Sequence, residues 1–262
     1  MRAHSSCYQA LFRATQCGDR RQPQHSQPQA TVSPNNTPTL SIVWQDEHLL
    51  VVDKPAGLVV HPARGHQEGT LSQLLAGRAA GGEPGRAGIV HRLDRDTSGL
   101  LVVACTEHAH RLLQAALRKR LIEREYLAMV EGRPPSRTGT IEAPIGRHPQ
   151  IRTKMAVGGV GAREARTHFT LERSLGRVSL LRLRLDTGRT HQIRVHLQAI
   201  GHPICGDPEY GTPGVLDLGR QFLHAARLAL PHPVTGAPVE VHSPLPGDLR
   251  DALVRAEAES RR

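Results

Sequence analysis

The chain has 262 residues, enough to bury an apolar core in one large domain or two small ones. Its apolar runs fall well short of the roughly 18 residues that a membrane-spanning helix needs, which argues against an integral membrane protein. Basic residues outnumber acidic ones by 34 to 24 and only three of them are lysines, so the net charge of +10 favours a polyanionic partner such as a nucleic acid, although a G- and C-rich genome would also favour arginine over lysine.

Residues 1–38 differ in composition from the rest of the chain. Residues 22–38 are rich in Pro, Gln, Ser, Asn and Thr, and such a segment buries too little apolar surface to offset the entropy lost on ordering. We therefore expect a disordered extension over residues 1–38 and an ordered domain over residues 39–262. The first eighteen residues contain arginine but no acid, so organelle targeting stays open beside the expected bacterial cytoplasmic location.

Cysteine and histidine spacing does not predict a metal site. The four cysteines are scattered along the chain without a C-x-x-C pair, which favours reduced thiols over a disulfide framework or a zinc site. His191 and His196 are five residues apart, a spacing that turns them to different sides of a helix.

The first half of the ordered region predicts short strands and one helix. Short aliphatic runs between polar, Pro or Gly positions predict extended structure at residues 42–44, 49–52, 58–60, 89–90 and 100–104. The Gly- and Ala-rich residues 77–88 predict a flexible loop. Thr106 is a good N-cap for a helix whose apolar residues recur at helical spacing as far as Leu121.

The second half predicts more strands and two further helices. Strands are expected at residues 126–130, 167–171 and 181–185, the last two with apolar and polar residues in alternation. After a turn at Asp186–Arg189, Thr190 can cap a short helix with Ile193, Leu197 and Ile200 on its apolar face and Gly201 at its end; another helix is expected at 248–259. Strands dominate without regular βαβ alternation, which predicts an α+β fold with a mixed, mostly antiparallel central sheet and flanking helices.

Asp94 is the first candidate for a chemical role. It lies in the run His91–Gly99, just before a buried strand, with Arg92, Arg95 and Asp96 beside it. A carboxylate among arginines stays ionised and can act as a nucleophile or base toward a sugar carbon. Taken by itself, however, this run fits a salt-bridged turn better than an active site.

The stretch Asp186–His196 and Tyr126 supply further candidates. A Gly turn before a capped helix suits anion binding, but the G-x-x-x-x-G-K-[ST] frame of a nucleotide triphosphatase is absent. Arg189, His191 and Arg194 could hold a backbone phosphate or a catalytic carboxylate, or could be solvated helix positions. Tyr126, at a strand start beside charges, could transfer a proton or could be an ordinary core tyrosine.

Taken together, these stretches resemble the RluA family of pseudouridine synthases, and within it the enzymes of large-subunit ribosomal RNA. The resemblance covers residues 38–250. Its matching stretches are 53–62, 88–100, 124–126, 144–147, 187–196 and 206–211. The family resemblance implies a mixed sheet with helices, a monomer, and the isomerisation of uridine to pseudouridine, a reaction that needs no cofactor because nothing is oxidised or added.

The resemblance also implies roles for individual residues. Asp94 matches the essential aspartate, and Arg194 matches the basic residue that pairs with it. Tyr126 matches the active-site tyrosine, which we expect near carbon 5 of the base. Arg92 matches the arginine that fills the place left by the target nucleotide, and Ile193 falls at an apolar pocket position.

The RNA target is less well defined by the sequence. Many similar enzymes carry a small RNA-binding module before the catalytic domain, and residues 1–38 are too short and too polar to be one. We therefore expect 23S ribosomal RNA as the first candidate substrate and transfer RNA as the second. The alternatives from other classes are a non-catalytic RNA-binding protein on the same fold, and a glycoside hydrolase or nucleosidase, for which Asp96 is only a weak second acid.

Overall fold

The computed structural model describes residues 40–62, 67–83, 86 and 88–262. The extension predicted over residues 1–38 lies outside the described residues. None of the helices in the described part of the chain combines the length and the apolar character that crossing a lipid bilayer would require.

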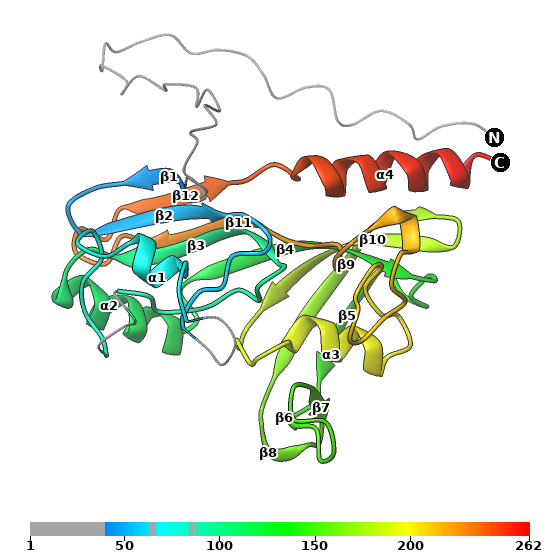
Figure 1. The fold of residues 1–262 in the computed structure, drawn as a ribbon, viewed down its shortest axis with the longest axis horizontal. Coiled ribbons are helices and arrows are strands. Elements are labelled where there is room, and N and C mark those ends of the chain that lie inside the picture. Colours follow the sequence, from blue (N-terminus) through cyan, green and yellow to red (C-terminus); the bar gives the residue numbers. More distant parts are fainter. Residues whose placement is uncertain (1–39, 63–66, 84–85, 87) are drawn as a thin grey trace, which may run out of the picture. The chain divides into compact units, whose positions relative to one another are not determined.

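A nine-stranded sheet forms the centre of the domain (Figure 1). Its main path runs in the order β1 (Ser41–Gln45), β2 (Leu49–Lys54), β3 (Ser98–Ala104), β11 (Leu223–Pro231), β4 (Glu123–Glu131), β10 (Val178–Leu185), β9 (Arg166–Leu175) and β5 (Thr138–Glu142), and β12 (Pro238–His242) pairs with β11. Strands β3 and β11 are parallel, and the other neighbouring pairs of this sheet are antiparallel. The predicted α+β class with a mixed, mostly antiparallel sheet is therefore confirmed.

Helices and a second, small sheet flank this central sheet. The helices are α1 (Leu71–Leu74), α2 (Glu107–Arg118), α3 (Gln192–Ala199) and α4 (Gly247–Ser260), with a short 3-10 turn η1 (Val215–Asp217). Helix α2 packs against β3, whereas α3 and α4 both pack against β9. The small sheet has the order β7 (Met155–Val157), β6 (Ile145–Arg147), β8 (Val160–Arg163) and projects from the central sheet beside α3 (Figure 1).

The apolar residues of β2 and β3 divide the core into two parts. Successive side chains of a strand point to opposite faces, so Leu50 and Val52 join one cluster while Leu49 and Val51 join the other. The second cluster includes the apolar face of α2, which begins where the Thr106 hydroxyl accepts the Ala109 amide at 3.1 Å. Both faces of these strands are therefore covered, which explains why their sequences read as continuous apolar runs.

Three local predictions in the first half of the ordered region are wrong. Residues 58–60 form no strand, because the carbonyls of Val59 and Val60 accept the first amides of α1 instead of pairing with a neighbouring strand. Ile89 makes only an isolated bridge to Val103. The helix predicted from Thr106 to Leu121 ends at Arg118, and Leu121 is 49% exposed.

The start of α3 also differs from the prediction. His191, not Thr190, is the N-cap residue, and it has a φ of 54° and makes no side-chain capping bond. Ile200 is 38% exposed and so does not belong to the buried face. The helix does end at Gly201, whose φ of 80° suits a residue just past a helix.

One row of residues across the sheet brings distant parts of the chain together. Gly99 on β3 lies opposite Ala225 on β11, which lies opposite Tyr126 on β4, and Tyr126 lies opposite Leu183 on β10. Gly99 has a φ of 109°, and a Cβ there would lie 2.3 Å from the Ala225 carbonyl oxygen. Only glycine permits this approach. The loop that precedes β3 is therefore fixed two strands away from Tyr126.

Candidate active site

The loop that carries Asp94 is held through its backbone. The Lys54 ammonium, which is fully buried, donates to the Arg95 carbonyl at 2.8 Å, and the Gly57 amide donates to the same oxygen at 2.9 Å. The Arg220 guanidinium donates to the Asp96 carbonyl at 2.9 Å. Because these bonds use backbone atoms, they fix the position of the loop and leave the Asp94 side chain free to react.

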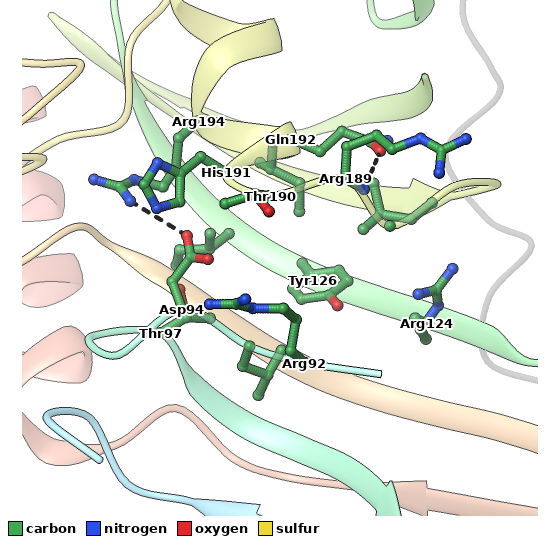
Figure 2. Close-up of a pocket in the computed structure, with 15 residues that line it drawn as sticks. Arg92, Asp94, Thr97, Arg124, Tyr126, Arg189, Thr190, His191, Gln192 and Arg194 are labelled. Carbon is green, nitrogen blue, oxygen red and sulfur yellow. Dashed lines mark hydrogen bonds and ion pairs between the residues drawn. The ribbon is translucent and has the colours of Figure 1, made fainter. Parts of the chain in front are cut away.

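Arg194, in the first turn of α3, faces Asp94 (Figure 2). Arg194 Nη1 donates to Asp94 Oδ2 at 3.3 Å, and the two side chains are 5% and 16% exposed, respectively. This pairing was predicted. It is the longest of the bonds that the guanidinium makes, so Asp94 is oriented by Arg194 but is not its main partner.

The main partner of Arg194 is Asp207, a residue to which the sequence assigned no role. Arg194 Nε and Nη2 donate to the two oxygens of Asp207 at 2.6 and 2.8 Å, and Nη2 also donates to Glu209 at 2.8 Å. The Asp207 side chain is 0% exposed and accepts the amides of Glu209 and Tyr210 as well. Asp207 thus holds the Arg194 guanidinium through a bidentate pair of hydrogen bonds. This pair fixes the position of Nη1, the nitrogen that donates to Asp94.

The charges of this cluster are mutually dependent. Burial opposes ionisation of Asp207, but its hydrogen bonds and ion pair with Arg194 outweigh burial and lower its pKa. Burial likewise disfavours the Arg194 cation, and Asp207, Asp94 and Glu209 outweigh it and raise the pKa of Arg194. One guanidinium therefore serves three carboxylates, those of Asp207, Glu209 and Asp94.

Tyr210 connects this cluster to His191 and to the small sheet. Its ring lies with its centroid 4.8 Å from the Arg194 guanidinium carbon, and its hydroxyl lies 2.9 Å from His191 Nδ1. The hydroxyl also accepts the Met155 amide of β7 at 2.8 Å, so its own proton is available to His191. Burial raises the pKa of Tyr210 to about 12 and lowers that of His191, so a neutral phenol donates to a neutral imidazole. This bond helps to hold His191 in its left-handed conformation.

A pocket opens between the Asp94 loop and the turn that precedes α3 (Figure 2). It is lined by predicted site residues and by several others, among them Arg92, Asp94, Tyr126, Arg189, His191 and Ile193. Tyr126 is 5% exposed, and burial raises the pKa of its hydroxyl. Its ring lies between Asp94 and the far end of the pocket, and in this position a flat ring could support a base.

The structure brings all seven predicted site residues to this pocket or its rim, but not every predicted contact is present. Arg95 pairs with Asp96 rather than with Asp94, and Arg92 is exposed at the pocket. The Arg189 side chain donates through Nε to the Glu164 carbonyl at 2.9 Å. The sequence suggested that the neighbouring arginines, Arg92 and Arg95, surround Asp94. In the structure its partner is instead Arg194 of α3, a hundred residues later in the chain.

The histidine spacing is explained by a structural role. His196 is fully buried, and its two ring nitrogens lie 2.9 Å from the Thr167 hydroxyl and 2.9 Å from the Ala143 carbonyl. Within the described residues, no group of three or more His, Cys, Asp and Glu side chains is placed to hold a metal ion.

Residues 48–199 match the family model described as RNA pseudouridylate synthase. This chain belongs to that family. The matched region contains Asp94, Tyr126 and Arg194, whereas Asp207 and Tyr210 lie beyond it.

Relatives of this chain are found among bacterial proteins. It is 55% identical over 206 residues to an uncharacterized RNA pseudouridine synthase of Chloroflexus aurantiacus, an alignment that covers 77% of this chain and 64% of that protein. It is 49% identical over 226 residues to ribosomal large subunit pseudouridine synthase D of Nitrosomonas europaea, covering 83% of this chain and 65% of that protein. The chain thus spans just under two thirds of the length of these two relatives.

Solved structures agree with the family assignment. Human RNA pseudouridylate synthase domain containing 1 superposes with a TM-score of 0.65 at 30% identity, over 82% of this chain and 87% of that one. The fold described above is therefore that of a pseudouridylate synthase.

Proposed function

We propose that this protein isomerises uridine to pseudouridine in structured RNA. The observation that carries the proposal is the Asp94 carboxylate, paired at 3.3 Å with a nearly buried arginine at the side of a pocket whose wall includes Tyr126. We assign catalysis to Asp94, Tyr126 and Arg194, and substrate binding to Arg92, Arg189, His191 and Ile193.

The chemistry fits the residue types present. Uridine and pseudouridine are isomers: the bond from the sugar to nitrogen 1 of the base breaks, the base turns, and a bond to carbon 5 forms, while carbon 5 loses a proton and nitrogen 1 gains one. Asp94 can assist the cleavage through its carboxylate, as carboxylates do in glycosidases. Arg194 orients Asp94, and Asp207 holds Arg194.

Tyr126 is suited to supporting the base and relaying a proton. Its pKa is raised by burial, so the hydroxyl is neutral near pH 7. A neutral hydroxyl is a weak base, and it can take up the carbon 5 proton only while it passes its own proton on. Ile193 adds an apolar contact to the same pocket.

The target must leave its stack before it can reach Asp94, which costs a few kcal/mol. Arg92, exposed at the pocket, is placed to fill the gap, and phosphate contacts from Arg189 and the basic surface would offset the cost. We propose 23S ribosomal RNA as the first substrate, supported by the name of the Nitrosomonas europaea relative, and transfer RNA as the second. We further propose that residues 39–262 form the catalytic domain of a monomer working in the bacterial cytoplasm.

The proposal is tested by mapping pseudouridine on RNA treated with the purified protein. Wild type, Asp94→Asn and a control, Asp251→Asn on the exposed side of α4, are incubated with 23S ribosomal and transfer RNA transcripts, followed by carbodiimide labelling and primer extension. We expect new pseudouridine with wild type and the control and none with Asp94→Asn. Equal activity of Asp94→Asn would refute its role. A wild type inactive on both RNAs would favour the non-catalytic binding protein.

A further inference from the structure

Arg124 is the one positively charged side chain of β4 that faces the pocket. Side chains alternate along the strand, so Arg124 and Tyr126 are buried on the pocket side, while Glu123 and Glu125 point to the other face. There Glu125 pairs with Arg182 at 3.1 Å and with Arg227 at 2.7 Å. The alternation therefore takes both neighbouring carboxylates away from Arg124.

The Arg124 guanidinium has no partner among the described residues. It is 8% exposed, it makes no hydrogen bond or ion pair with any described side chain or carbonyl, and its Nε is buried without an acceptor. A buried charge without a partner is costly to folding. A ligand that supplies acceptors is one way to compensate such a group, and Arg124 lines a pocket where a ligand could do so.

The surroundings of Arg124 show which ligand atoms could do so. Asp94 is the one carboxylate among the residues that line the pocket, and Figure 2 places it across the Tyr126 ring from Arg124. The Arg124 end is closed by the 188–190 turn: a Cβ on Gly188 would lie 3.0 Å from Arg124 Nη1. A ligand that reaches Asp94 and lies along Tyr126 thus extends its far edge toward the unpartnered N–H donors of Arg124.

We propose that Arg124 reads the target base by donating to a carbonyl oxygen of uracil. This rests on the proposed function, in which the sugar carbon lies at Asp94 and the base lies along Tyr126. The far edge of uracil offers carbonyl oxygens, which accept, and arginine only donates. When the base leaves with the bonding electron pair, negative charge spreads onto these oxygens. The contact therefore strengthens as the sugar–base bond breaks, which is the requirement for lowering a reaction barrier.

The kinetic test compares Arg124→Met with wild type and with a control, Arg111→Met on the exposed face of α2. On RNA with a normal target uridine, we expect kcat/KM to fall about 10- to 100-fold for Arg124→Met and to stay unchanged for the control. Arg124→Lys keeps the positive charge but lacks the planar set of guanidinium donors, so its kcat/KM should lie between those of Arg124→Met and wild type. Unchanged activity of Arg124→Met would refute this inference alone, whereas a wild type that makes no pseudouridine would refute the proposed function and the inference with it.

Modified substrates test the atom that Arg124 contacts. RNAs carrying 2-thiouridine or 4-thiouridine at the target position replace one carbonyl oxygen by sulfur, a weaker acceptor. One of the two should slow wild type and give no further loss with Arg124→Met, because the same contact cannot be lost twice. Fully additive losses with both thio substrates would refute a contact with the base.

Salt dependence and stability exclude the remaining explanations. If Arg124 met a phosphate instead, Arg124→Met would reduce the slope of log binding constant against log salt by about one; we expect an unchanged slope. If its role were structural, Arg124→Met would unfold at lower urea concentration. We expect the same or a higher midpoint, because the substitution removes an uncompensated buried charge.

Discussion

Replacing Asp207 by asparagine removes the charge that faces Arg194 while keeping the shape of the side chain. In the structure the carboxylate takes two bonds from Arg194, at 2.6 and 2.8 Å, and two from backbone amides. Both side chains are buried, at 0% and 5% exposed. In asparagine an NH2 group replaces one of the two carboxylate oxygens, so it would face an N–H group of Arg194 or of the backbone. Arg194 would then depend on its other partners, Glu209 and Asp94.

The expected loss of stability follows from this burial. Breaking a buried ion pair by removing one partner costs about 3–5 kcal/mol, and the two remaining carboxylates place Asp207→Asn near the lower end, about 3 kcal/mol. For a domain of this size that loss lowers Tm by about 6–12 °C. Catalysis should also suffer, because a misplaced Arg194 no longer orients Asp94; we expect kcat to fall about 10- to 100-fold.

Urea unfolding and pseudouridine formation are measured on the same preparations, with Glu259→Gln as the matched control. Glu259 pairs with Arg177 at the surface, where the two side chains are 44% and 67% exposed, so its loss should cost about 0–1 kcal/mol. If Asp207→Asn were no less stable than the control, or retained full kcat, Asp207 would not be the residue that fixes the site.

Acidity should reproduce part of this effect. The pKa of Asp207 is held below its usual value of 3.8, so its contribution is present above that pH and is lost as the pH falls through the lower folded value. The free energy of unfolding of wild type should therefore decline more steeply below about pH 4 than that of Asp207→Asn. Parallel curves would contradict this assignment.

Three further substitutions separate catalysis from stability. Tyr126→Phe should leave stability within about 0.5 kcal/mol, because the hydroxyl makes no hydrogen bond with a described residue, yet lower kcat at least about 100-fold; an active variant would exclude the proton relay. Thr106→Ala should cost about 0.5–2 kcal/mol in urea unfolding by removing the cap on the Ala109 amide, with kcat unchanged. Lys54→Met removes the donor from the carbonyls of Pro55, Leu58 and Arg95, the last of which keeps the Gly57 amide, and should cost about 2–5 kcal/mol and lower kcat; intact activity would show that the Asp94 loop does not depend on the Lys54 bond.

The sequence predicted those elements whose signal is local. The strand before Cys105 is a continuous apolar run, the helix after Thr106 has a cap and helical spacing, and both were found close to the predicted bounds. Strand β11 was missed although it lies in the middle of the sheet. Its residues His224, Ala225 and Ala226 are small or polar, and they are buried because β3 and β4 flank this part of the strand, not because of their own hydropathy.

The candidate site divides in the same way. Asp94, Tyr126 and Arg194 were predicted from a family resemblance, because the motifs that carry them follow one another in the order of that family. The chain neighbours of Asp94 suggested the wrong partners, and nothing local indicated that Asp207 would hold Arg194 or that Arg124 would be left unpaired. Those facts depend on which side of a strand or helix each side chain faces and on what lies opposite it. The sequence by itself thus determined which reactive groups this protein carries, while only the tertiary structure decided which charges meet, because strand pairing and helix packing bring together residues a hundred positions apart.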